Sequence, residues 1–280
     1  MSDPRDTPAN VRIAADRLRG VIDAPRYSAG EVMHVTAPIA ELLRAPGGAR
    51  DRQLCLGEAM RVYEVHEGWA YGEALRDGYA GYMRADALTP AAEPTHRVAA
   101  RATHLYPTPD FKAHETAALS HGSLLEVLST GPRFAETPHG FVPKAHLAPV
   151  DAHETDPVSV AALFLGTPYL WGGNSSFGTD CSGLVQMACL ACAIPCPGDA
   201  DQQEARLGRP LPPDAPLRRG DLLFWRGHVA WVAAPDMLLH ANAFHMATAH
   251  EPLDAALARI EAQGGGPVTS RKRLGETKDD

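Results

Sequence analysis

The cysteine in the stretch GTDCSGLVQM (178–187) stands where a protein could place a nucleophile. Apolar residues follow Cys181 at helical spacing and Pro195 ends the run, so the pattern predicts a helix with Cys181 in its first turn. The partial positive charge and unpaired amides of a helix N-terminus favour a thiolate over a thiol. Such a thiolate could attack a carbonyl carbon while nearby N–H groups hold the oxyanion. Because cysteine is also among the most buried residue types, the motif taken alone leaves catalysis and packing equally open.

Two segments downstream supply the other groups that a cysteine nucleophile requires. The segment RRGDLLFWRGHVAWV (218–232) predicts two strands joined by a tight turn, with His228 at the start of the second strand. The segment MLLHANAF (237–244) predicts a third strand that places His240 and Asn242 on one face. A cysteine on a helix, a histidine on a facing strand and a polar residue on the next strand form a nucleophile, a base and an orienting group.

Together these segments resemble the NlpC/P60 family of papain-like cysteine peptidases, through the D-C-S-G helix start, G-D-L-x-F followed by H-V-A, and L-H-A-N. The resemblance implies an α+β papain-like (NlpC/P60) catalytic domain. It assigns Cys181 as the nucleophile, His228 as the general base and His240 as the group that orients His228. Asn242 shares the strand face of His240 and stays the alternative orienting residue. Tyr169, in PYLWGG, matches a family tyrosine that could donate its hydroxyl to the oxyanion, or it could serve packing alone.

These candidates lie in the last part of the chain, where the composition changes. From Asp151 onward helix-period patterns appear beside strands, and we place the catalytic domain at 151–280. Its end predicts a helix over EPLDAALARI (251–260) and a last strand over PVTSRKRL (267–274). We expect neither of these two segments to have a catalytic role.

Two similar stretches of alternating apolar and polar residues precede that domain. Gly57 in the first corresponds to Gly122 in the second, which indicates an internal repeat of two small all-β barrels. The pattern resembles bacterial SH3 domains; the first copy has Trp69 and GYAGYM, whereas the second lacks the tryptophan. The two modules could also serve only as a scaffold. We expect a leader at 1–27, a first SH3-like domain at 28–92 and a second at 93–150.

The pairing of SH3-like modules with this peptidase domain resembles the dipeptidyl-peptidase VI type of NlpC/P60 enzyme. That resemblance implies hydrolysis of the bond between γ-D-glutamate and the next diamino acid in free murein peptides, releasing L-Ala-D-Glu during peptidoglycan recycling. Selecting a free N-terminus needs anions that receive an ammonium group and a wall that stops longer substrates. By the resemblance, the substrate-binding residues are Glu58, Tyr79, Trp171, Asp180, Ser182 and Asp199.

Three of these residues, Glu58, Tyr79 and Asp199, would form an amine clamp across the domain boundary. Ala200 replaces the serine that the subgroup usually carries after Asp199, so one polar contact with substrate is in doubt. Each residue has a structural alternative: Glu58 as a solvated strand residue, Tyr79 as a barrel-closing aromatic, and Asp199 as a loop or cap residue. Asp180 suits the position before a helix and could act only as its cap.

Composition bounds the partners and the compartment that we expect. A net charge of −8 and a pI near 5.9 give no basic field for a nucleic acid backbone. The chain shows no secretory signal and no apolar run near the roughly 18 residues of a membrane span. We therefore expect a cytoplasmic monomer that needs no cofactor or metal and binds neither nucleic acid nor membrane. The five cysteines are odd in number, which suits reduced thiols.

Three further interpretations stay open. Cys189, Cys192 and Cys196 give a C-x2-C-x3-C pattern that could suggest zinc, although a fourth ligand is lacking and the helix predicts packing for the first two. The SH3-like pair could bind a wall peptide or a partner while the last domain is a degenerate peptidase. A cysteine–histidine papain-like site also supports amidase or acyl-transfer chemistry through the same acyl-enzyme.

Overall fold

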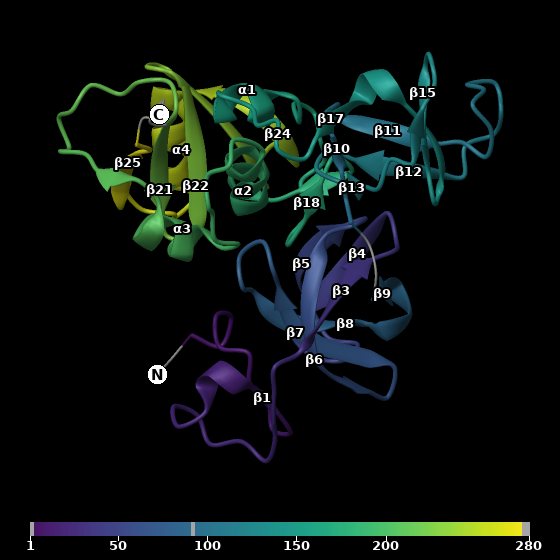
Figure 1. Ribbon diagram of the computed structural model, residues 1–280. Helices are drawn as coiled ribbons and strands as arrows, with labels where there is room; N and C mark the ends of the chain where they lie inside the picture. Colours follow the sequence, from purple (N-terminus) through teal and green to yellow (C-terminus); the bar gives the residue numbers. More distant parts are fainter. Residues whose placement is uncertain (1–2, 91–92, 276–280) are drawn as a thin grey trace. The chain divides into compact units, whose positions relative to one another are not determined.

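The computed structural model describes residues 3–90 and 93–275, and the chain divides into two compact units, 1–152 and 153–280. Figure 1 colours the first unit from purple to teal and the second from teal-green to yellow. Each unit has its own hydrophobic cores. The division of the first unit into a leader and two modules stays a prediction.

The first unit is built mainly from a seven-stranded antiparallel sheet in the order β5-β4-β8-β7-β6-β3-β9. Side chains alternate along β4, where Ala40 and Leu42 are buried while Glu41 between them is exposed, as a sheet with one covered face requires. The strands are β3 (Glu31–Val35), β4 (Ile39–Leu43), β5 (Arg50–Cys55), β6 (Ala59–His66), β7 (Trp69–Ala74), β8 (Ala80–Arg84) and β9 (Leu88–Thr89), with a 3-10 turn at Ala85–Ala87.

The leader lies against this sheet. Ile13 and Ala15 pack with Tyr63 and Tyr71, and the Arg17 guanidinium donates to the Glu73 carboxylate. This ion pair between the exposed Arg17 and the buried Glu73 ties the leader to the sheet. Its elements are β1 (Ala14–Ala15), a 3-10 turn (Asp16–Leu18) and β2 (Tyr27–Ser28).

The rest of the first unit consists of small antiparallel sheets in the orders β13-β10-β17, β11-β12 and β14-β15-β16. They join the larger sheet beside Gly57, where the Leu124 amide donates to the carbonyl of the preceding residue, Leu56, over 2.8 Å. The strands are β10 (His96–Val98), β11 (Ala102–Leu105), β12 (Ala117–Ser120), β13 (Leu124–Leu125), β14 (Ser129–Thr130), β15 (Phe134–Thr137), β16 (Gly140–Pro143) and β17 (Leu147–Pro149), with a 3-10 turn at Lys144–His146.

The second unit is a six-stranded antiparallel sheet, β20-β25-β21-β22-β23-β24, with helices on both faces. Figure 1 shows α2 beside β22 and α4 behind β21 and β22. The elements are α1 (Pro157–Ala162), β18 (Asn174–Ser175), β19 (Gly178–Thr179), α2 (Cys181–Ala191), α3 (Ala200–Arg206), β20 (Arg209–Pro210), β21 (Asp221–Trp225), β22 (His228–Ala234), β23 (Met237–Asn242), β24 (Ala247–Pro252), α4 (Leu253–Ala262) and β25 (Ser270–Arg273).

Alternation along the strands divides the core of the second unit in two. Phe224 and Trp231 pack with α1 and α2, whereas Trp225 and Val232 pack with α4. Both tryptophans are fully buried, so a sheet covered on both faces carries the largest side chains at its centre. The predicted strands around the turn at 226–227 and the third strand are confirmed.

Two predicted boundaries need correction. The helix predicted over 251–260 begins at Leu253, because Glu251 and Pro252 still belong to β24. The last strand is shorter than predicted and spans Ser270–Arg273. Glu251 and Pro252 pair with β23, which the local pattern does not reveal, and the last strand is limited to the four residues that pair with β21.

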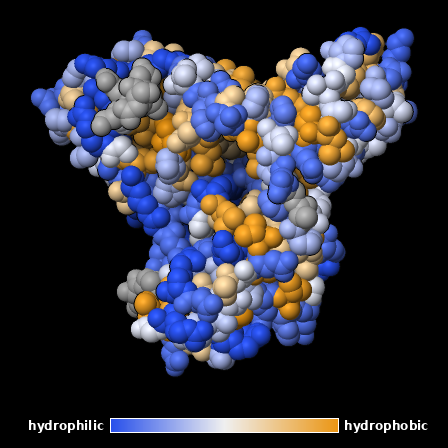
Figure 2. Space-filling view, in the orientation of Figure 1, coloured by the Kyte–Doolittle hydropathy of each residue, from blue (hydrophilic) through white to orange (hydrophobic). Residues whose placement is uncertain are grey.

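The surface drawn in Figure 2 is largely hydrophilic with hydrophobic patches between. Within residues 3–90 and 93–275, no helix is both long enough and apolar enough to cross a membrane.

Candidate active site

Cys181 is the first residue of α2, as predicted, and its side chain is 7% exposed. The helix positions it beside the turn between β21 and β22, where its Sγ lies 4.0 Å from the carbonyl oxygen of Gly227. His228 follows that glycine directly and begins β22. The fold therefore brings the predicted nucleophile to the residue next to the predicted base.

Asp180 is the N-cap of α2 and fixes the chain on both sides of the cysteine. Its carboxylate accepts from the Gly183 amide over 2.7 Å, from the Gly172 amide over 2.9 Å and from the Ser182 hydroxyl over 3.1 Å. Asp180 and Ser182 are both buried. Asp180 therefore caps the helix, as the structural alternative expects. A direct contact of Asp180 or Ser182 with substrate stays a prediction.

His228 and His240 are joined by a hydrogen bond, with Nε2 of His228 and Nδ1 of His240 2.9 Å apart. Asn242, the alternative orienting residue, instead uses its Oδ1 to accept from the backbone amide of His245 over 2.8 Å. The structure therefore brings His240, and not Asn242, into contact with His228.

The chain of contacts continues beyond His240 to two residues that the sequence interpretation missed. Nε2 of His240 lies 2.9 Å from Oε2 of Glu251, and Arg259 on α4 donates to both carboxylate oxygens of Glu251 over 2.8 Å. The expectation that the segment 251–260 is without a part in the site came from taking Glu251 as helical. Had β24 been extended to Pro252, Glu251 would have stood two residues from Ala249, the cross-strand partner of His240.

Burial dominates the electrostatics of this group. It lowers the pKa of His228, and the neighbouring His240 lowers it further. Burial also lowers the pKa of His240, although the Glu251 carboxylate opposes that shift. Hydrogen bonds from Arg259 hold the pKa of Glu251 below its ordinary value. Near neutral pH the two imidazoles are therefore neutral and Glu251 is ionised.

Three other predicted residues lie on loops and helix ends of the second unit. Tyr169 is half-buried against the core under α2, and its amide donates to the Met246 carbonyl. Trp171 is 71% exposed, as a wall that meets substrate would require. Asp199 precedes α3 and accepts the Gln203 amide on its backbone carbonyl. Their contacts with a substrate stay predictions.

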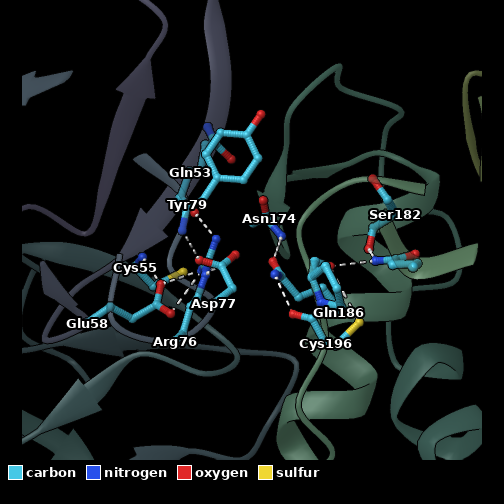
Figure 3. A network of polar contacts seen from close by, with 12 residues as sticks. Gln53, Cys55, Glu58, Arg76, Asp77, Tyr79, Asn174, Ser182, Gln186 and Cys196 are labelled. Atoms are coloured by element: carbon cyan, nitrogen blue, oxygen red, sulfur yellow. Dashed lines mark hydrogen bonds and ion pairs between the residues drawn. The ribbon is translucent and has the colours of Figure 1, made fainter. Parts of the chain in front are cut away.

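Glu58 and Tyr79 belong to the first unit. The Glu58 carboxylate accepts from the Arg76 guanidinium over 2.8 and 2.9 Å and from the Cys55 amide over 2.6 Å, so it is not the solvated strand residue of the structural alternative (Figure 3). Tyr79 is buried in the core of the seven-stranded sheet. The predicted clamp of these residues with Asp199 stays a prediction.

The C-x2-C-x3-C cysteines lie in the core beneath α2. Cys189, Cys192 and Cys196 are buried among apolar side chains, and none of the five cysteines is joined in a disulfide. Figure 3 shows how polar groups organise this region: Gln186 donates to the Cys196 carbonyl and accepts from Asn174. Across residues 3–90 and 93–275, no group of three His, Cys, Asp or Glu side chains is arranged to hold a metal ion.

Comparison with known families gives two matches. A bacterial dipeptidyl-peptidase SH3 domain matches residues 42–88, and the NlpC/P60 family matches residues 166–255. A crystal structure of an NlpC/P60 family protein from Bacillus cereus superposes with a TM-score of 0.74, covering 87% of this chain and 99% of that chain. Its identity is 21%, so the likeness concerns the fold.

Two curated relatives carry a more specific name, gamma-D-glutamyl-L-lysine dipeptidyl-peptidase. The protein from Bacillus subtilis is 41% identical over 88 residues, covering 30% of this chain and 29% of that protein. The protein from Bacillus cereus is 28% identical over 202 residues, covering 62% of this chain and 60% of that protein. The chain thus spans less than two thirds of the length of these relatives.

Proposed function

Because residues 166–255 match the NlpC/P60 family and follow a match to a bacterial dipeptidyl-peptidase SH3 domain, we propose that this chain is a cysteine peptidase of murein peptides. The bond cut is the one between γ-D-glutamate and the next diamino acid, and the released product is L-Ala-D-Glu. The names of the two Bacillus relatives support this substrate class. A cytoplasmic, monomeric enzyme acting on free peptides during recycling is part of the same proposal.

One observation carries the catalytic part of the proposal. Cys181 begins a helix beside the turn that leads into His228, and His228 is hydrogen-bonded to His240. This arrangement contains a nucleophile, a base and an orienting group in three successive parts of one core.

The mechanism follows from the charge states of these groups. His228 is neutral in the resting protein and takes the thiol proton of Cys181 as the sulfur attacks the γ-glutamyl carbonyl carbon. We expect these two side chains to come into hydrogen-bonding contact when substrate fills the site, since catalytic hydrogen bonds are commonly formed or shortened in the substrate complex. The imidazolium of His228 then protonates the departing amine, and the acyl group stays on sulfur. Water, deprotonated by His228, releases L-Ala-D-Glu.

The oxyanion of the tetrahedral intermediate needs donors at the start of α2. The orphan amides of a helix N-terminus point toward such a position, and the Tyr169 hydroxyl is our proposed additional donor. Asp180 contributes by holding the first turn, since it binds the Gly183 amide while also pinning Gly172.

Selection of peptides with a free L-Ala amine is assigned to Asp199, Glu58 and Tyr79. Arg76 already offsets the charge of Glu58, so the net attraction of this pair for an ammonium group is smaller than that of an isolated carboxylate. We therefore expect Asp199→Asn to raise KM for the free-amine peptide more than Glu58→Gln does. Unchanged KM in both variants removes the clamp from the proposal.

The decisive experiment identifies products by mass spectrometry from L-Ala-γ-D-Glu-meso-diaminopimelate, with and without N-acetylation. The proposal predicts L-Ala-D-Glu from the free-amine peptide only, with wild type but not with Cys181→Ala. Cys189→Ser, a buried cysteine of the same helix, is the matched control and keeps activity. Cleavage of both peptides removes the amine specificity but leaves the peptidase.

The same experiment separates the alternatives. If added amines capture the acyl group instead of water, the site is an acyltransferase built on the same chemistry. If neither peptide is cut while both bind, the SH3-like modules make the chain a wall-peptide binding protein.

A further inference from the structure

We propose that Glu251 and Arg259 form a positioning pair that sets which nitrogen of His228 is free to act as a base. The inference rests on the proposed peptidase function and goes beyond its three catalytic candidates. Both residues lie outside the segments that suggested catalysis: Glu251 ends β24 and Arg259 lies on α4.

The first step is the direction of the hydrogen bond between His240 and Glu251. Glu251 is buried, and Arg259 grips its carboxylate with two hydrogen bonds of 2.8 Å, which keeps the group ionised. An ionised carboxylate can only accept. Nε2 of His240, 2.9 Å from Oε2 of Glu251, therefore carries a proton and donates it.

The second step carries this choice to His228. A neutral imidazole has one donor and one acceptor nitrogen, so Nδ1 of His240 is the acceptor. Nε2 of His228, 2.9 Å away, must then donate, and Nδ1 of His228 keeps its lone pair. Among the described residues that Nδ1 has no hydrogen-bond partner, as a general base for Cys181 requires. Glu251 thus selects the reactive tautomer across two hydrogen bonds.

The third step is the part played by Arg259. Four groups face His240: His228 on β22, His245 after β23, Glu251 on β24 and Arg259 on α4. Without Arg259 the Glu251 carboxylate would be an uncompensated anion beside His240 and would favour an imidazolium there, which cannot accept from His228. Phe244 lies over the guanidinium, 4.6 Å from it, and packs the arginine in place.

During attack, the proton of the Cys181 thiol moves to Nδ1 of His228, and the S–H electron pair forms the new bond to the carbonyl carbon. His228 then carries protons on both nitrogens. Its Nε2–H continues to donate to His240, which donates to Glu251. Glu251 stays ionised throughout and stabilises the imidazolium through the intervening ring.

Glu251→Leu tests the tautomer directly because it removes both acceptor oxygens at similar volume. Oε2 of Glu251 accepts from both His240 and Arg259, so without it the Arg259 guanidinium favours a lone pair on Nε2 of His240. His240 then carries its proton on Nδ1, Nε2 of His228 becomes the acceptor, and Nδ1 of His228 carries a proton and can no longer act as the base. We expect kcat to fall about tenfold to a hundredfold, the range typical when a residue that only orients a functional side chain is replaced. KM should change less than twofold, and Glu261→Gln, on an exposed residue of α4, should match wild type.

Two readouts distinguish positioning from a merely structural loss. The 15N NMR shifts of the imidazoles, which need no substrate, should show Nε2–H on His228 and His240 in wild type and Nδ1–H in Glu251→Leu. The acid limb of the alkylation rate of Cys181 by iodoacetamide should move to higher pH in Arg259→Met and to lower pH in Glu251→Leu. Arg259→Lys keeps the positive charge but not the paired N–H donors of the guanidinium. Its acid limb should lie between those of wild type and Arg259→Met.

The outcomes separate this inference from the proposed function. If wild type cuts the murein peptide and Glu251→Leu retains the Nε2–H tautomers with kcat within twofold, the positioning pair is refuted. If wild type cuts no murein peptide but the tautomers and the opposite pH shifts are as predicted, the inference stands and the proposed substrate fails. Should Glu251→Leu not fold, Arg259→Lys and Arg259→Met still test the direction of the pH shift, and a shift to lower pH in Arg259→Met refutes the inference.

Discussion

The N-cap of the nucleophile helix makes a quantitative prediction about both stability and activity. Asp180 binds the amides of Gly183 and Gly172 and the hydroxyl of Ser182, and it is buried. Asp180→Ala deletes both acceptor oxygens, and with them three hydrogen bonds, while leaving the backbone donors inside the protein. The change therefore measures what it takes to hold Cys181 at a fixed helix start.

The magnitude follows from the number of orphaned donors. An unsatisfied buried amide costs about 1 to 3 kcal/mol, so the amides of Gly183 and Gly172 together cost about 2 to 6 kcal/mol. Ser182 adds little because its hydroxyl can rotate toward another acceptor. We predict that Asp180→Ala lowers the free energy of unfolding of the second unit by about 4 kcal/mol, which is larger than the typical loss of about 1 kcal/mol for an exposed cap.

The assay is urea unfolding followed by fluorescence of the buried tryptophans Trp225 and Trp231, which report the core of the second unit. Asp180→Asn is the matched variant, because its amide oxygen can keep one backbone donor while its NH2 opposes the other. Its free energy of unfolding should fall by roughly half as much as that of the alanine variant. Both variants should also reduce kcat, since the first turn of α2 is no longer pinned at Gly172.

Two results would refute this reasoning. One is a free energy of unfolding for Asp180→Ala within about 1 kcal/mol of wild type, which is below the cost of even two orphaned amides. The other is a larger loss for Asp180→Asn than for Asp180→Ala, which would mean that the carboxylate is not mainly an acceptor for the two backbone amides.

Three further predictions concern the scaffold. Gly57→Ala should destabilise the first unit by about 2 kcal/mol or more, because Gly57 has φ +79° and a Cβ there would lie 2.2 Å from a backbone carbonyl oxygen. Thermal unfolding of both proteins measures the effect, and an unchanged melting temperature would contradict the close approach. Asp221→Ala should lower the free energy of unfolding of the second unit, since it removes the buried carboxylate that accepts from the Arg273 guanidinium and the Arg218 amide, and an unchanged free energy in urea unfolding would be inconsistent with those contacts. Burial lowers the pKa of His228 and His240 in the folded protein. Below their unfolded pKa of about 6.5 the unfolded chain therefore binds more protons than the folded chain, and the free energy of unfolding falls as the pH is lowered. Urea titrations from pH 7 to pH 5 should show this loss of stability, and the loss should be smaller in His240→Gln. A free energy of unfolding that rises on acidification would contradict the prediction.

Local patterns predict the part of the site that depends on neighbours in sequence. The start of α2 at Cys181 follows from helical spacing and an aspartate at the cap, and the two strands around the turn at 226–227 follow from alternation and a glycine. Alternation along the third strand leaves His240 and Asn242 equally placed on one face, and the family resemblance rather than local spacing favours His240, which is the one hydrogen-bonded to His228.

Long-range pairing is what the sequence does not reveal. Glu251 stands before a proline and an amphipathic run, so local propensity assigns it to a helix, yet β24 extends to Pro252 because it pairs with β23 along its whole length. Arg259 reaches Glu251 only because α4 folds back over the sheet. Similarly, the charge pair that occupies Glu58 depends on Arg76, from a turn two strands later.

The most direct test of the central claim is to trap the acyl-enzyme. The protein is mixed with L-Ala-γ-D-Glu-meso-diaminopimelate, quenched in acid within the first turnover and digested for mass spectrometry. We predict an L-Ala-γ-D-Glu acyl group on the peptide that contains Cys181, and neither adduct nor product with Cys181→Ala. Release of L-Ala-D-Glu by Cys181→Ala at the wild-type rate, with the Cys181 peptide of wild type unmodified, would contradict the claim that this cysteine is the nucleophile.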